Sequence, residues 1–148
     1  MKKVALLTGI LALVLVSGMT VSGCASLGGA PKTFSRGSGG ETTILLRPSL
    51  NFDQAFREVI FILNRHGFNP EMMQTEAGFI RTGWNHHWVT GSTTERYRVR
   101  VIVQFNPART QLILNPEGEW LQRGVWIRGF DTRAVETLRN DINVVIGN

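Results

Sequence analysis

The stretch RYRVRVIVQF, residues 96–105, decides the fold that this sequence predicts. Every odd position from Tyr97 to Phe105 is apolar, and arginine or glutamine occupies most of the even positions. Because side chains of a strand alternate between the two faces of a sheet, this period of two gives one apolar and one polar face. A strand with one wet face is typical of an antiparallel sheet. We therefore expect the odd-numbered face to lie in the core.

Shorter segments on both sides of this strand predict the rest of the sheet. They are rich in β-branched, aromatic and other apolar residues and end at turn residues. The further strands that we expect are residues 42–47, 68–75, 79–84 and 110–115. Pro116 to Gly118 is expected to break the last of these, with residues 119–122 as a candidate continuation and residues 123–130 leading to a final helix.

Two amphipathic helices flank these strands. The first has Asn51 as a suitable N-cap and Gly67, after His66, as a suitable left-handed C-cap, whereas the second begins near Asp131 or Thr132. Apolar side chains recur every three or four residues in both segments. They are Phe52, Phe56, Val59 and Leu63 in the first helix, and Val135, Leu138, Ile142 and Val145 in the second. These stripes predict helices that pack on a sheet.

The elements together predict a single α+β domain at residues 42–148. We expect one antiparallel β-sheet covered on one face by two helices, in the order β-α-β-β-β-β-α. The helices should cover the face that carries Val99, Val101 and Val103.

The N-terminal segment has the layout of a secretory signal peptide. Lys2 and Lys3 precede an apolar run at residues 4–16, which is shorter than the span of about 20 apolar residues that crosses a bilayer. Residues 21–24, Val-Ser-Gly-Cys, resemble the lipobox of bacterial lipoproteins. We therefore predict a signal peptide at residues 1–23. The resemblance implies that Cys24 is acylated after cleavage and anchors the chain to a membrane.

The segment after the lipobox is rich in glycine and serine and poor in apolar residues. We predict that residues 24–41 are the lipidated cysteine and a flexible tether, with an r.m.s. reach of roughly 20–25 Å. Residue 25 is alanine. The lipoprotein resemblance then implies the outer membrane, facing the periplasm, if the source bacterium has two membranes.

Composition excludes several classes of protein and site. Cys24 is the only cysteine, so an internal disulfide and a zinc site built on several thiolates are both excluded. Without Lys2 and Lys3 the chain holds 14 basic and 11 acidic residues. This modest excess does not indicate a nucleic-acid partner, and no later apolar run is long enough to cross a bilayer.

Three histidines are the only grouping that suggests metal or proton chemistry: His66, His86 and His87. Adjacent histidines of a strand point to opposite faces, and a zinc site needs three or four converging ligands. The sequence also lacks a nucleophile elbow, a phosphate loop and a His-Glu-x-x-His helix. We therefore expect no metal, no cofactor and no catalytic residue, and an enzyme is the weakest hypothesis.

Arginine and tryptophan side chains supply a candidate binding surface. Arg96, Arg98 and Arg100 form a row on one strand face, which could bind an anionic ligand or an acidic partner. The alternative is an ordinary solvated sheet face, on which cross-strand ion pairs with Glu117 or Glu119 would neutralise the row. The chain also has four tryptophans, and some must be in the core. Trp88 lies in a polar loop and is the one we expect to be exposed. The candidate binding surface is Trp88, Arg96, Arg98 and Arg100.

Two short runs resemble the helix-grip domains of the C component of the β-barrel assembly machinery, which is an outer-membrane lipoprotein. These runs are EAGFIRTGW at residues 76–84 and RYRVRV at residues 96–101, and they follow a similar opening helix. The resemblance implies a helix-grip fold and a non-enzymatic scaffold or accessory lipoprotein.

Two functional hypotheses follow. The first is a lipid-anchored envelope protein whose domain binds another envelope protein at the membrane surface, possible roles being outer-membrane assembly or maintenance. The alternative is a small-ligand binding module in the periplasm, with a pocket between sheet and helices for a lipid or glycan.

Overall fold

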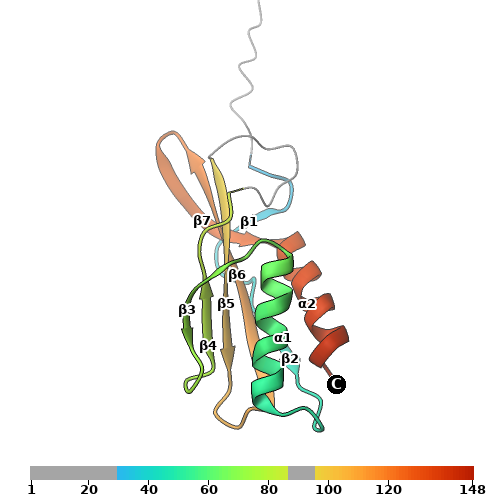
Figure 1. Ribbon diagram of the computed structural model, residues 1–148. Coiled ribbons are helices and arrows are strands. Elements are labelled where there is room, and N and C mark those ends of the chain that lie inside the picture. Colours follow the sequence, from blue (N-terminus) through green and yellow to red (C-terminus); the bar gives the residue numbers. More distant parts are fainter. Residues whose placement is uncertain (1–29, 87–95) are drawn as a thin grey trace, which may run out of the picture.

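The computed structural model describes residues 30–86 and 96–148, which form an α+β fold (Figure 1). In these residues one antiparallel sheet of seven strands carries two helices, α1 (Phe52–Arg65) and α2 (Thr132–Ile146), on one face. The strands are β1 (Phe34–Arg36), β2 (Thr42–Leu45), β3 (Pro70–Gln74), β4 (Phe79–Thr82), β5 (Tyr97–Phe105), β6 (Gln111–Gln122) and β7 (Val125–Asp131). Neither helix has the length and apolar character to cross a membrane. The predicted fold class is confirmed.

The observed element order is longer than predicted, because the sheet holds two additional strands. It reads β-β-α-β-β-β-β-β-α, and the sheet order is β1-β7-β6-β5-β4-β3. β1 lies inside the segment predicted to be a flexible tether and pairs with β7. β7 itself occupies residues that the sequence left as a connection. β2 pairs with the other half of the β6 edge that β7 uses.

The core lies between the sheet and the helices, as the alternation in β5 predicts. Tyr97, Val99, Val101, Val103 and Phe105 are all buried. From the helices, the buried side chains are Ala55, Phe56, Val59, Ile62, Leu63, Ala134, Leu138, Ile142 and Ile146. In α2 the stripe is therefore rotated slightly from the prediction, since Ala134 and Ile146 are buried while Val135 and Val145 are only partly so.

Pro116 does not break β6, contrary to the prediction. It pairs with Val101 inside a continuous strand of 12 residues. Its position lies between Leu114, which pairs with β2, and Glu117, which pairs with β7. Because that edge of β6 has no strand partner at this point, the missing N–H of proline removes no ladder bond.

Both ends of α1 follow the predicted capping chemistry. The Asn51 side chain accepts a 2.8 Å hydrogen bond from the Gln54 amide. At the other end Gly67 has a φ of 77°, and the Phe68 amide donates to the Leu63 carbonyl at 2.9 Å. This arrangement satisfies the last carbonyls of the helix and buries Phe68.

A buried carboxylate connects the start of α2 with two strands. Asp131 is the N-cap of α2, and its Oδ1 accepts from the Ala134 amide at 2.8 Å. Its Oδ2 accepts from the Thr33 hydroxyl at 2.7 Å and from the Tyr97 hydroxyl at 2.5 Å. Burial, followed by the hydrogen bond to Asp131, raises the pKa of Tyr97 far above its ordinary value. The phenol therefore remains a donor.

We predict that Asp131→Ala lowers the free energy of unfolding by about 2–4 kcal/mol, because it removes a helix cap and leaves the buried Tyr97 hydroxyl and the partly buried Thr33 hydroxyl without their acceptor. Urea denaturation of the two proteins measures this difference. Glu136→Ala, which removes an exposed carboxylate from the same helix, should change the value by less than about 0.5 kcal/mol. Equal effects of the two substitutions would contradict the assignment of Asp131 as a structural hub.

The two helices are also joined by charged side chains. Asp141 of α2 contacts Arg65 at 2.6 Å and His66 Nε2 at 2.7 Å, both at the C-terminal end of α1. The His66 hydrogen bond, together with Arg65, lowers the pKa of Asp141 below its ordinary value of 3.8. A carboxyl group with a lowered folded-state pKa stabilises the fold above its unfolded-state pKa and loses that contribution as the pH falls.

We therefore predict that Asp141→Asn destabilises the protein by about 0.5 kcal/mol at pH 7, the scale of a partly exposed ion pair. The difference from the parent protein should shrink as the pH falls below 3.8 and through the lowered pKa of Asp141. Chemical denaturation between pH 7 and about pH 2 follows this trend. A difference that stays constant over the whole range would rule out the ionised form of Asp141 as its source.

Candidate functional site

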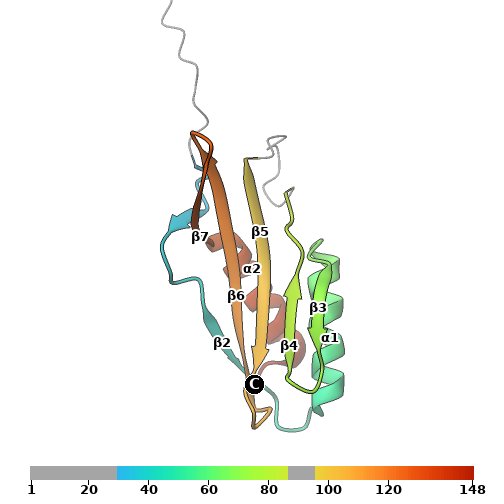
Figure 2. The same ribbon diagram turned by 90° about the vertical axis from the view of Figure 1, so that its left-hand side faces the viewer.

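The face of the sheet opposite the helices is open in the described residues (Figure 2). It carries the even positions of β5 and the side chains paired with them across the sheet. Near the β6–β7 turn these side chains are charged and aromatic. Toward the other end polar and apolar side chains are mixed, and the exposed apolar ones are Leu45 and Ile113, which are 58% and 37% exposed.

A bulge in β4 brings Trp84 onto this open face. Arg81 pairs with Ile102, and the next pairing joins Asn85 to Val99, so the β4 side contains one extra residue. In regular register Trp84 would share the core face of Ile80 and Thr82, whereas the extra residue reverses its side. The Thr82 hydroxyl compensates for the irregular ladder by accepting the Val101 amide at 2.9 Å.

Arg98 lies between two tryptophan rings. Its guanidinium carbon is 4.4 Å from the Trp84 ring centroid and 4.1 Å from that of Trp126 in β7. Arg100 also contacts Trp84, at 4.5 Å. These cation–π contacts, each worth about 0.5–2 kcal/mol, hold half-buried rings and arginines in one arrangement.

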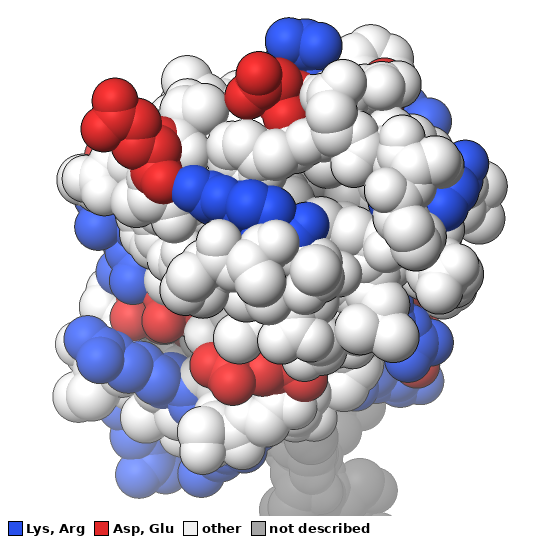
Figure 3. All heavy atoms as spheres, turned by 90° about the horizontal axis from the view of Figure 1, so that it is seen from below, with Lys and Arg blue, Asp and Glu red and all other residues white. Residues whose placement is uncertain are grey.

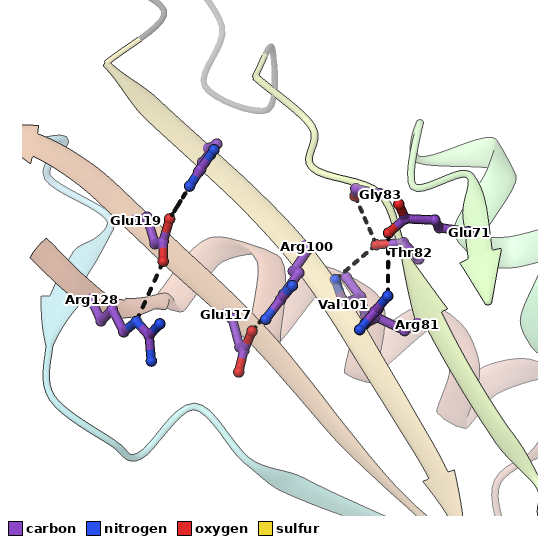
Figure 4. Close-up of polar contacts among 10 residues, drawn as sticks. Glu71, Arg81, Thr82, Gly83, Arg100, Val101, Glu117, Glu119 and Arg128 are labelled. Atoms are coloured by element: carbon purple, nitrogen blue, oxygen red, sulfur yellow. Dashed lines mark hydrogen bonds and ion pairs between the residues drawn. The ribbon is translucent and has the colours of Figure 1, made fainter. Parts of the chain in front are cut away.

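Two glutamates of β6 complete the charge pattern (Figure 4). Glu119, which is nearly buried, accepts from Arg98 at 2.6 and 2.8 Å and lies 3.5 Å from Arg128. Glu117 pairs with Arg100 at 2.6 Å. The predicted cross-strand neutralisation of Arg98 and Arg100 is thus confirmed. Arg128 differs from both, since its side chain is 89% exposed.

A groove of about 570 Å³ runs beside these ion pairs. Its walls include Trp84, Arg100, Arg128 and Phe130 from the sheet and the glycine-rich residues 37–41, which follow β1. Gly40 packs closely against Phe130. A Cβ added to Gly40 would be only 2.6 Å from the Phe130 Cβ. The glycine therefore lets the 37–41 segment lie close to the sheet.

The structure brings two residues of the predicted binding surface together and places further residues beside them. Arg98 and Arg100 lie together on the open face, while Arg96 precedes β5 at the β6–β7 end. Trp88 and Cys24, the predicted acylation site, lie outside the described residues, as does His87. Residues that sequence reasoning did not place in the site are Trp84, Trp126, Arg128, Phe130 and residues 37–41. The repeated Trp and Phe at even positions 126–130 would have been the signal, had β7 been recognised.

The two histidines in the described residues, His66 and His86, have different surroundings. His66 contacts Asp141, and the buried Nδ1 of His86 has no hydrogen-bond partner among the described atoms. Within residues 30–86 and 96–148, no three His, Cys, Asp or Glu side chains form a group able to hold a metal ion.

Comparison with known proteins found no matching family model and no matching curated sequence.

We predict that Gly40→Ala displaces residues 37–41 from the open face, because its Cβ collides with Phe130. The expected cost is about 1–3 kcal/mol in the free energy of unfolding, the usual range for overpacking. Faster amide hydrogen exchange in residues 37–41 would report the displacement. Gly83→Ala is the matched control, since its added Cβ would meet only the Asn69 carbonyl at 4.0 Å. Unchanged exchange in Gly40→Ala would contradict the close packing.

Proposed function

We propose that this protein is a lipid-anchored, non-enzymatic accessory protein of the bacterial cell envelope that binds a partner protein. The signal-peptide pattern, the lipobox ending at Cys24 and the likeness to a barrel-assembly lipoprotein support the setting. In a bacterium with two membranes the anchor belongs in the outer membrane and the domain in the periplasm.

The observation that carries the proposal is the aromatic and arginine surface on the open sheet face. Trp and Arg are among the side chains that contribute most to protein–protein binding. Here Arg98 fixes the rings of Trp84 and Trp126, so little rotamer freedom remains to be lost on binding. The exposed Leu45 and Ile113 extend the same face with apolar area. A partner that covers this face would bury both parts.

A second candidate function is the binding of a small glycan or lipid. The groove volume of about 570 Å³ lies within the usual range for ligand pockets, which favours this alternative. The groove is on the open face, whereas the pocket expected from sequence lay between sheet and helices. That interior holds many fully buried apolar side chains, Val59, Leu63, Val101 and Leu138 among them.

The test is photocrosslinking in bacterial cells that produce the full chain. A photoreactive residue at Ser38, which is exposed and lines the groove, should form a reproducible adduct with one envelope protein. The same residue at Val144, which is 78% exposed on α2, is the matched control and should not give that adduct. Adding Arg128→Ala should weaken the Ser38 adduct at least several-fold, because it removes the exposed cation of the groove.

Adducts only to lipid or glycan at Ser38 would favour the small-ligand alternative. Equal protein adducts at Ser38 and Val144, or none at Ser38, would contradict binding through the open face.

A further inference from the structure

We infer that the end of the domain around the β6–β7 turn is a contact surface for anionic lipid headgroups. The inference rests on the lipid anchor of the proposed function, and it adds an orientation and a second membrane contact. Three features carry it: the length of chain before the fold, the place where the fold begins, and the charge at that end.

The chain between Cys24 and the fold is much shorter than the predicted tether. Ala30 packs against the core, the Pro31 carbonyl accepts from the Phe34 amide at 2.9 Å, and Thr33 bonds to Asp131. Only residues 25–29 then separate Cys24 from the described fold. At about 3.3–3.6 Å per residue this connection spans at most roughly 20 Å.

The described chain begins at the same end of the molecule as the β6–β7 turn. Figures 1 and 2 both show the first blue segment beside this turn and the C-terminus at the opposite end. An anchor at Cys24 therefore holds the β6–β7 end within a short distance of the bilayer and directs the C-terminal end away from it.

Cations gather at this end. Arg36 donates to the Gln122 side chain at 3.1 Å, the Arg96 carbonyl accepts the Leu121 amide at 2.7 Å, and Arg123 lies in the turn itself. Lys32, Arg36, Arg96 and Arg123 are all exposed. Residues 30–40 and 120–130 contain no Asp or Glu. The opposite end instead shows both signs of charge side by side (Figure 3).

The turn also presents an apolar side chain. Val125 is 61% exposed and lies two residues after Arg123. A cation beside an exposed aliphatic group matches the boundary between headgroups and acyl chains. Each cation near an anionic leaflet strengthens binding by roughly fivefold. The β6–β7 end therefore has the charge, the apolar tip and the position required for this contact.

The experiment uses residues 24–148 with Cys24→Ser, so that no acyl chain contributes. Residues 30–148 hold the whole core and every described element. We expect binding to phosphatidylcholine vesicles containing phosphatidylglycerol, and little binding to pure phosphatidylcholine. The double variant Arg96→Gln with Arg123→Gln should bind the anionic vesicles about 25-fold more weakly. Arg57→Gln with Arg139→Gln, two exposed arginines of α1 and α2, gives the same net charge and should bind within about twofold of the parent.

A second measurement tests the orientation. The Cys24→Ser chain has no other cysteine, so Val125→Cys and Val144→Cys each give a single labelling site. An environment-sensitive fluorophore at position 125 should shift to the blue on anionic vesicles, and the same fluorophore at position 144 should not. Equal losses in the two double variants, equal shifts at the two positions, or no binding to anionic vesicles would overturn the inference. Because neither measurement involves the groove or acylation, failure here is distinguishable from failure of the crosslinking at Ser38.

Discussion

The arrangement of this domain depends on the buried carboxylate of Asp131. A buried carboxylate is costly unless donors satisfy its oxygens, and here the donors come from three separate parts of the chain. The Ala134 amide starts α2, the Tyr97 hydroxyl belongs to β5, and the Thr33 hydroxyl precedes β1. Satisfying one side chain therefore fixes the last helix, the central sheet and the N-terminal segment relative to one another. Local propensity would not hold the three-residue β1 in place, whereas this contact acts together with the pairing to β7 and the packing of Phe34 on Tyr97 and Trp120.

The position of β1 in turn shapes the open face. β1 pairs with β7 at Gly129, where an added Cβ would be 2.0 Å from the Ser35 carbonyl oxygen, so only glycine allows this approach. Residues 37–41 then leave β1 along the sheet and pass over Phe130 to reach β2. One wall of the groove is consequently made by a segment that has few apolar side chains of its own. It is placed by the strand pairings of β1 and β2 at its two ends and by the close approach of Gly39 and Gly40 to the Phe130 side chain.

The parts of this fold that local rules determine can be predicted from the sequence. The alternation in β5 gives the buried face, the amphipathic stripes give both helices, and Asn51 and Gly67 give the ends of α1. The features that depend on strand pairing cannot be predicted in this way. β1 is too short and glycine-flanked to be recognised, β7 has aromatic side chains on its open face that obscure alternation, and Pro116 is tolerated only because its free edge falls between two partners. The one-residue bulge that turns Trp84 outward likewise depends on Thr82 meeting the Val101 amide.

The ion pairs of the open face are compatible with both a solvated surface and a binding surface. The packing of the arginines against tryptophan rings distinguishes the two better than the ion pairs do. An ordinary solvated face needs no packed tryptophans, yet Arg98 is held between two of them while it also neutralises a nearly buried glutamate. Such a cluster has already lost most of its hydration and flexibility before any partner arrives, which lowers the cost of association. The groove beside it includes residues 37–41, a few residues after the start of the described fold. With the anchor proposed at Cys24, a partner that reaches this groove must itself lie close to the membrane surface.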